Sequence, residues 1–231
     1  MLVPVSLGDA PWTRFLPVEA QELAATLRHF VVESPKAARA HLKRLAHPLP
    51  LRELDIQALP ENGGMDALDA LLAPALTGHD VGLMSDAGCP AVADPGARLV
   101  ARAHELGIAV RPLVGPSSIL LALMASGLNG QSFAFHGYLP VADIDRTASL
   151  RQLEAESRKL GRTQIFIETP YRNERLFEGI LRACTPETRL CIACDLTTSG
   201  EWIRTMTVAR WARSEKPDLA RRPALFLMLA S

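Results

Sequence analysis

Small residues, chiefly glycine, alanine and serine, follow two apolar strands in the stretch between Asp80 and Leu128. The first turn begins at Ser85 and reads SDAGCPAVADPG, and the second begins at Gly115 and reads GPSS. Glycine and alanine let a ligand approach the backbone closely, and the helix after each turn begins with N–H groups that lack helical partners. The spacing therefore predicts a binding site for a cofactor with polar parts.

The commonest nucleotide-binding motifs are missing from the sequence. No G-x-G-x-x-G follows the first expected strand, which ends in Ser6-Leu7-Gly8-Asp9, and no G-x-x-x-x-G-K-[ST] loop occurs. A nicotinamide-dependent oxidoreductase is therefore disfavoured. The pair Cys191-x-x-Cys194 has the spacing of a metal or redox site, but residues three apart in a strand face opposite sides. We expect no metal.

Composition narrows the class of protein. The 231 residues carry 25 basic and 25 acidic side chains, so no overall charge attracts nucleic acid, although a local basic face still can. The four cysteines are too sparse for a disulfide framework, and the first residues lack the organisation of a signal peptide. Apolar runs are far shorter than the roughly 20 residues that cross a bilayer. We expect a cytoplasmic protein with no membrane partner.

Strand-like and helix-like segments alternate along the chain. Five strands are expected in residues 1–137, with one helix near 18–28 and another that starts at Ser34-Pro35, a cap serine followed by a first-turn proline. A change in composition after residue 137 predicts two domains, 1–137 and 138–231. The alternation is typical of an α/β fold of two αβα domains with mostly parallel sheets, and two close strands in 194–207 indicate an antiparallel hairpin.

Several motifs occur together in one order. The most specific is S-D-A-G-x-P-x-x-x-D-P-G followed by G-P-S-S, and together with weaker matches it resembles the tetrapyrrole (corrin/porphyrin) methylase family, in particular the branch that modifies small-subunit ribosomal RNA. The resemblance covers nearly the whole chain. The weaker matches are Ala125-Ser126-Gly127-Leu128, Phe135-His136-Gly137-Tyr138-Leu139-Pro140, Glu168-Thr169-Pro170-Tyr171-Arg172, Asp195-Leu196-Thr197 with Glu201, and Pro223-Ala224-Leu225.

The resemblance implies that S-adenosylmethionine binds in a cleft between two α/β domains. On the family's pattern, backbone groups of the first turn would contact the amino-acid and ribose end of the cofactor. The serine pair would offer hydroxyl and N–H groups, and residues at three strand ends would line the adenine pocket. The expected cofactor-binding residues are Asp86, Gly88, Ala91, Val92, Ala93, Ser117, Ser118, Ile167, Cys194 and Ala224.

Some of these motifs also have an ordinary structural explanation. A serine before an apolar helix is usually an N-cap, so Ser117-Ser118 could serve a helix without any ligand. Asp94-Pro95 is an arrangement typical of a helix start, for which we expect a structural role. Of the six histidines only His136 invites a functional interpretation, and a structural hydrogen bond is the better explanation even there.

Methyl transfer from a sulfonium is an in-line displacement with an activated leaving group, so the protein mainly has to align the reactants. A hydroxyl acceptor would need a base, for which the carboxylates are candidates. Arg172 would suit a phosphate or another anionic group on the acceptor. The sequence singles out no catalytic residue, and the candidates are Glu168, Asp195, Glu201 and Arg172, with Asp9 as a further carboxylate.

The segments that would face the acceptor match the family least. The RNA-modifying branch has a Gly-Asn turn and an Asp-Thr-Arg segment where this chain has Ser6-Leu7-Gly8-Asp9 and Glu33-Ser34-Pro35-Lys36. The acceptor therefore stays open between a ribose 2′-hydroxyl of ribosomal RNA and a tetrapyrrole or another small molecule. Basic residues that would serve RNA are Lys36, Arg39, Lys43, Arg44, Arg221 and Arg222.

The family resemblance also implies a homodimer. One alternative of a different class is a non-catalytic S-adenosylmethionine-binding protein of the same fold, which would act as a sensor or an interaction module. Both hypotheses require cofactor binding, and they differ in whether a methyl group is transferred.

Overall fold

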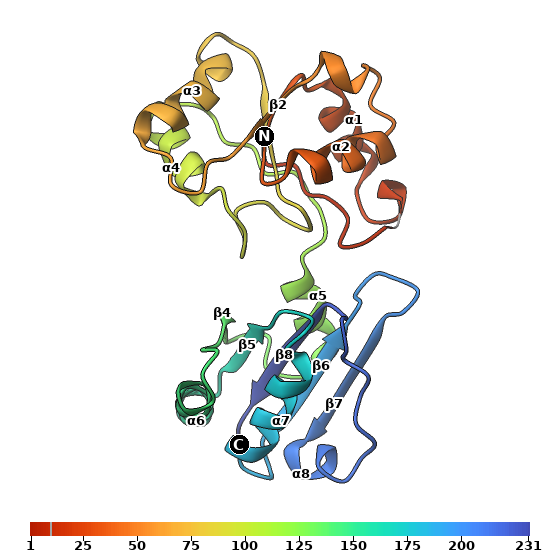
Figure 1. Cartoon of the computed structure of the whole chain (residues 1–231), viewed down its shortest axis with the longest axis vertical. Coiled ribbons are helices and arrows are strands. Elements are labelled where there is room, and N and C mark those ends of the chain that lie inside the picture. The colour runs from red at the N-terminus through yellow and green to blue at the C-terminus, as the bar shows by residue number, and fades with distance from the viewer. Residues whose placement is uncertain (10) are drawn as a thin grey trace. The chain divides into compact units, whose positions relative to one another are not determined.

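The computed structural model describes residues 1–9 and 11–231, which fall into two compact units, Met1–Ser117 and Ser118–Ser231. In Figure 1 unit 1 runs from red to light green and unit 2 from green to blue. The division comes earlier than the one expected after residue 137. The reason is that helix α5 (Ser118–Ser126), which precedes the compositional change, packs against strands of unit 2.

Unit 1 is built on a parallel sheet of β1 (His29–Val32), β2 (Asp55–Ala58) and β3 (Val81–Met84), in the order β2-β1-β3. Two further strands expected from the sequence are reduced to isolated bridges, at Leu2 beside β3 and at Pro112 beside Leu2. Proline has no N–H to donate, so Pro4 and Pro112 cut these ladders short. The first segment still lies next to β3, because the Val3 N–H donates to Leu83 O at 2.9 Å.

Helices cover both faces of this sheet, and two apolar clusters fill the space beneath them. The predicted start of the second helix is confirmed: Ser34 Oγ accepts a hydrogen bond from the Ala37 N–H at 3.4 Å, with Pro35 in the first turn. The helical elements are η1 (Trp12–Arg14), α1 (Val18–Thr26), α2 (Pro35–Arg44), η2 (Leu51–Glu53), α3 (Met65–Leu76) and α4 (Ala97–Glu105).

Unit 2 holds a five-stranded sheet in the order β4-β5-β8-β6-β7. Only β4 and β5 pair in parallel, so the expectation of a mostly parallel sheet is wrong for this unit. The last strand, β8, inserts between β5 and β6 and runs against both. The hairpin of β6 and β7 predicted from the sequence is confirmed. The strands are β4 (Phe133–Tyr138), β5 (Thr163–Ile167), β6 (Arg189–Cys194), β7 (Trp202–Thr207) and β8 (Ala224–Leu229).

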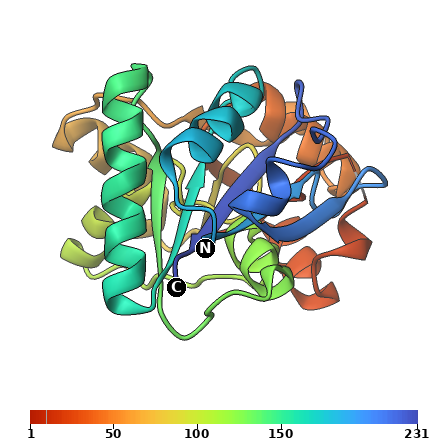
Figure 2. The ribbon, with the colours of Figure 1, turned by 90° about the horizontal axis from the view of Figure 1, so that it is seen from below.

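Three helices lie over one side of this sheet: α6 (Asp143–Leu160), α7 (Asn173–Ala183) and α8 (Val208–Trp211). Figure 2 shows the long helix α6 in green beside the strands. The core between them includes the stacked rings of Phe166 and Phe226. Among residues 1–9 and 11–231, no helix is long and apolar enough to cross a membrane.

A buried carboxylate ties α6 to the loop before β6. Glu154 Oε1 accepts hydrogen bonds from the Thr185 N–H at 2.7 Å, from the Thr185 hydroxyl at 3.0 Å and from the Thr188 hydroxyl. Glu154 is 5% exposed, so water cannot replace these partners. This one side chain therefore fixes the end of α7 relative to α6.

The substitution Glu154→Ala should lower the free energy of unfolding by about 3 kcal/mol, because it leaves buried donors without an acceptor. Glu156→Ala on the same helix breaks only a part-exposed pair with Arg162 and should cost less than about 1 kcal/mol. Urea unfolding of the two variants measures the difference. Equal losses for both would contradict the anchoring role of Glu154.

Candidate functional site

The segment from Ser85 to Gly96, which joins β3 to α4, turns repeatedly through the left-handed backbone region. Gly88 has φ +72° and Gly96 has φ +130°, and two alanines, Ala91 and Ala93, have φ +64° and +62°. A left-handed alanine costs roughly 1–2 kcal/mol, and residues in such conformations cluster at ligand sites. The turn follows the carboxyl end of a parallel strand, which is where open α/β sheets bind ligands.

The structure brings together the two small-residue segments singled out in the sequence. The Cys89 thiol donates to Pro116 O at 3.3 Å, and the Val5 N–H donates to Gly88 O at 2.9 Å. Burial raises the pKa of Cys89, so the thiol keeps the proton that it donates. A Cβ on Gly115 would lie 2.2 Å from Pro4 Cβ, so this contact requires glycine. Both walls of the expected site in unit 1 are thus held against the first segment.

The expected cofactor residues of unit 1 differ in exposure. Asp86, Val92 and Ala93 are exposed, with Val92 at 49%, whereas Ala91 is half-buried and Gly88 is buried. Ser117 is the last residue of unit 1, and Ser118 begins α5. The turn therefore presents backbone and small side chains at its surface, as a close-fitting ligand would require.

Three carboxylates gather beside the turn. Glu33, at the carboxyl end of β1, accepts a hydrogen bond from the Asp86 N–H at 3.1 Å. Burial, helped by the nearby charges of Glu33 and Asp86, raises the pKa of Asp94 to about 6. The cluster makes this end of the sheet in unit 1 electronegative and suits a ligand that carries positive charge.

Asp94 does not cap a helix, contrary to the expectation from Asp94-Pro95. Helix α4 begins at Ala97, and Gly96 occupies the cap position. Glycine tolerates the positive φ that this position adopts. The half-buried Asp94 side chain instead faces the carboxylate cluster.

The three strand-end residues expected to line the adenine pocket lie at the same end of the three inner strands of unit 2. Cys194 pairs with Ala224, and Ile167 pairs with Leu225 next to it. Side chains alternate along a strand, so Ile167 faces the side opposite to Cys194 and Ala224, which lie in the core under the helices. Burial raises the pKa of Cys194 to about 11, so it acts as a small neutral side chain.

Each of the catalytic candidates in unit 2 is held by neighbours. Glu168 Oε1 accepts from Arg172 Nη2 at 2.6 Å and from the Thr169 N–H at 2.7 Å. Asp195 accepts from Arg222 Nε at 2.6 Å, and Glu201 accepts from the Thr197 N–H at 2.7 Å. The loop after β6 is strained, with Asp195 at φ +48° and Thr197 at φ +71°.

These candidates gather at one end of the sheet. Glu168 and Asp195 directly follow β5 and β6, which point the same way, and Asn173 Nδ2 donates to Arg222 O at 2.7 Å. This hydrogen bond joins the start of α7, next to the Glu168–Arg172 pair, to the arginine that holds Asp195. The structure therefore collects the carboxylates and fixes them, and it leaves the choice of a base open.

The histidine singled out in the sequence has the structural hydrogen bond expected of it. His136 Nε2 lies 2.6 Å from Gln164 Oε1 on the neighbouring strand. The sequence reasoning missed His41, which lies beside the Asp86 turn with Nε2 2.9 Å from Asp86 O. A signal was present in α2, because His41 lies on the same face as Ala38 and Leu42, among otherwise apolar inward positions.

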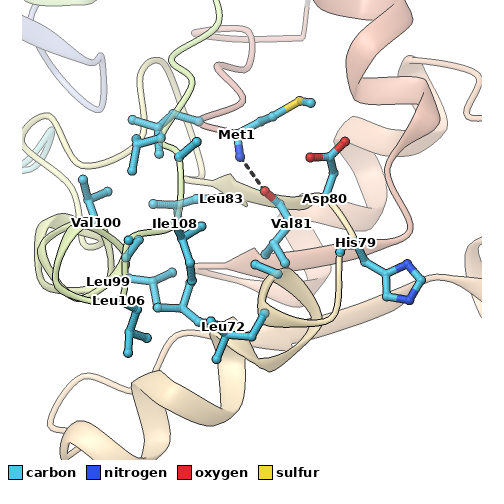
Figure 3. Close-up of a pocket in the computed structure, with 18 residues that line it drawn as sticks. Met1, Leu72, His79, Asp80, Val81, Leu83, Leu99, Val100, Leu106 and Ile108 are labelled. Carbon is cyan, nitrogen blue, oxygen red and sulfur yellow. Dashed lines mark hydrogen bonds between the residues drawn. The ribbon is translucent and has the colours of Figure 1, made fainter.

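A cavity of about 460 Å³ in unit 1 lies at the other end of β3. Figure 3 shows Leu72, Leu99 and Ile108 pointing into it and His79 pointing away. It opens beside Val81, the first residue of β3, whereas the strained turn follows Met84 at the carboxyl end. The cavity is therefore separate from the carboxylate cluster.

The raised pKa of Asp94 makes a prediction about stability. The folded protein holds a proton on Asp94 up to about pH 6, whereas the unfolded chain releases it near the ordinary pKa of 3.8. At neutral pH the buried carboxyl is ionised, so Asp94 then destabilises the folded state. Asp94→Asn should stabilise the protein near pH 7, and the gain should vanish toward about pH 4. Urea unfolding over this range measures it, with the exposed Asp145→Asn as control. A gain that does not change with pH would refute the prediction.

The fold has a known counterpart. The crystal structure of the methyltransferase CobJ superimposes with a TM-score of 0.62 over 94% of this chain and 89% of that chain, at 19% sequence identity. The likeness establishes the shared fold.

Curated relatives share more of the sequence. Proteins named ribosomal RNA small subunit methyltransferase I are 40% identical over 65% of this chain in Mesorhizobium japonicum, 35% over 66% in Vibrio cholerae and 32% over 86% in Pseudomonas aeruginosa. The matched regions span 50%, 51% and 64% of those relatives, so the chain spans about half the length of the first two.

The assignment of the chain to a family rests on a family model that matches most of its residues. The model of tetrapyrrole (corrin/porphyrin) methylases matches residues 13–212, which include the strained turn, the serine pair and the carboxylate-bearing loops of unit 2. The chain belongs to the tetrapyrrole (corrin/porphyrin) methylase family.

Proposed function

We propose that the protein is an S-adenosylmethionine-dependent methyltransferase. The observation that carries the proposal is the strained small-residue turn from Ser85 to Gly96, at the carboxyl end of β3, in a chain of the methylase family. Left-handed alanines are retained only where the surroundings demand them, and close approach of a ligand is one such demand.

The residues of the turn fit this cofactor. Ala91 and Ala93 present no bulk, and Val92 between them is exposed, so the ribose and amino-acid parts can lie against the backbone. The carboxylates Asp86 and Glu33 suit the positive charge of the amino group and the sulfonium. For unit 2 we propose that the adenine ring contacts the backbone at the strand ends of Ile167, Cys194 and Ala224, because the side chains of these residues face opposite sides of the sheet.

The bound cofactor would supply a methyl group on a positively charged sulfur that leaves readily. The protein's residues then have to orient the acceptor and exclude water, which suits the fixed side chains of unit 2. Glu168, Asp195 and Glu201 remain candidates for a base that takes a hydroxyl proton, and Arg172 remains a candidate to hold an anionic acceptor group.

RNA is the acceptor that we favour, because the curated relatives are named for ribosomal RNA. A basic face supports this choice: α2 carries Lys36, Arg39 and Lys43 and has no acidic residue. A tetrapyrrole or another small molecule is the competing acceptor.

We also propose a cytoplasmic homodimer, for which the exposed Leu120 and Met124 of α5 offer apolar surface.

Incubation of the protein with methyl-labelled S-adenosylmethionine and a cell extract should transfer label to the RNA fraction. Separation of the extract into RNA, protein and small molecules before counting identifies the acceptor class. Label in the small-molecule fraction would show that the acceptor is a small molecule and not RNA. Binding of the cofactor without label in any fraction would favour the non-catalytic sensor instead.

Calorimetric titration with S-adenosylhomocysteine tests the turn directly. Val92→Trp should weaken binding at least about tenfold, because a bulky ring would occupy the surface where the cofactor lies. Val92 has an ordinary backbone conformation, so the substitution should leave the fold intact. Val18→Trp, at an exposed valine on α1, is the matched control. Unchanged affinity in Val92→Trp would show that the turn does not contact the cofactor. Absence of binding by the unaltered protein would refute the proposed function.

A further inference from the structure

Two polar side chains of helix α2, His41 and Arg44, contact two turns of unit 1. His41 contacts the turn that follows β3, and Arg44 contacts the turn of residues 6–9. His41 is 3% exposed, and its Nε2 lies 2.9 Å from Asp86 O. Its Nδ1 lies 2.9 Å from Arg44 Nη2. Arg44 continues the chain of contacts, since Nη1 donates to Gly8 O at 2.9 Å.

The directions of these hydrogen bonds follow from chemistry. A guanidinium can only donate, so Nδ1 of His41 must accept and carries no proton. Nε2 then holds the ring proton and donates it to Asp86 O. Burial, with a smaller contribution from the Arg44 charge, lowers the pKa of His41, which agrees with a neutral ring.

The backbone of Asp86 is consequently held on both sides of its Cα, through its own N–H and its own carbonyl oxygen. Glu33 Oε2 accepts from its N–H at 3.1 Å, and His41 donates to its carbonyl oxygen. The Arg44 contact connects this clamp to Gly8, in the turn of residues 6–9. Neither His41 nor Arg44 lies in the small-residue turn itself, so their effect on a ligand there passes through the backbone.

We propose that His41 and Arg44 are positioning residues, which hold the turn of residues 85–88 in register with the turn of residues 6–9 so that unit 1 can bind the cofactor. The proposal rests on the proposed function. It assigns to α2 the support of the turn that carries Asp86 and Gly88, in addition to its part in the core of unit 1.

A second histidine provides a comparison within unit 1. His47 is half-buried, whereas His41 is buried, and the His47 Nε2 lies 3.0 Å from Leu27 O, just before the amino end of β1. It makes the same kind of hydrogen bond at the end of the sheet away from the turns. A purely structural role predicts similar consequences for both histidines, whereas a positioning role predicts that only His41 affects ligand binding.

The test compares the affinity for S-adenosylhomocysteine with the melting temperature in matched variants. His41→Leu should weaken binding about tenfold or more, since the Asp86 carbonyl and the Arg44 donor both lose their partner. His41→Gln, whose amide can still donate to Asp86 O, should restore affinity to within about threefold of the unaltered protein. His47→Leu should lower the melting temperature and leave affinity unchanged.

Arg44→Gln tests the inference even if a His41 variant does not fold. Arg44 is part-exposed and lies at the end of α2, so its substitution should leave the fold intact. It should weaken binding and change the nitrogen chemical shifts of the His41 ring, while Arg28→Gln, at an exposed arginine of unit 1, changes neither. Three outcomes would overturn the inference. The affinity would be unchanged in His41→Leu or Arg44→Gln, it would fall equally in His47→Leu, or it would stay low in His41→Gln. If the unaltered protein does not bind, the proposed function fails and this inference falls with it.

Discussion

The backbone of unit 1 has to pass from β3 into α4 through a turn that most side chains cannot adopt. Four residues between Gly88 and Gly96 take left-handed conformations, and two of them are alanines. Such a turn is stable only if its surroundings fix it, because each alanine would relax to a commoner conformation in a free peptide. Much of unit 1 can be understood as the set of contacts that prevents this relaxation.

Those contacts come from three directions. The first segment pairs through Val5 with Gly88, the loop before Ser117 accepts the Cys89 thiol, and α2 reaches Asp86 through His41. The segments are far apart in the sequence and meet because the parallel strands place their carboxyl ends at one edge. A rigid site formed in this way needs little reorganisation when a ligand binds.

Unit 2 treats its polar groups differently. Its carboxylates are paired with arginines or with backbone N–H groups, and Arg222 also donates to Gly200 O at 2.7 Å. Fixed charges of this kind suit a reaction in which the cofactor carries the leaving group and the protein supplies alignment. The family and the shared fold agree with a site that mainly aligns bound reactants.

The sequence by itself determined the family, the two small-residue turns, the Ser34 cap and the hairpin of β6 and β7, because each depends on neighbouring residues or on a motif that they form. The alternation predicts the direction of three strands of unit 2, since β4, β5 and β6 do run the same way, but not that of β8, which runs against β5 and β6. Only the tertiary structure decided that β8 lies between β5 and β6, since a periodic pattern carries no information about which strands are neighbours. The same holds for the pKa of Asp94 and the clamp on Asp86, because both arise from side chains that the folded chain brings together from distant positions.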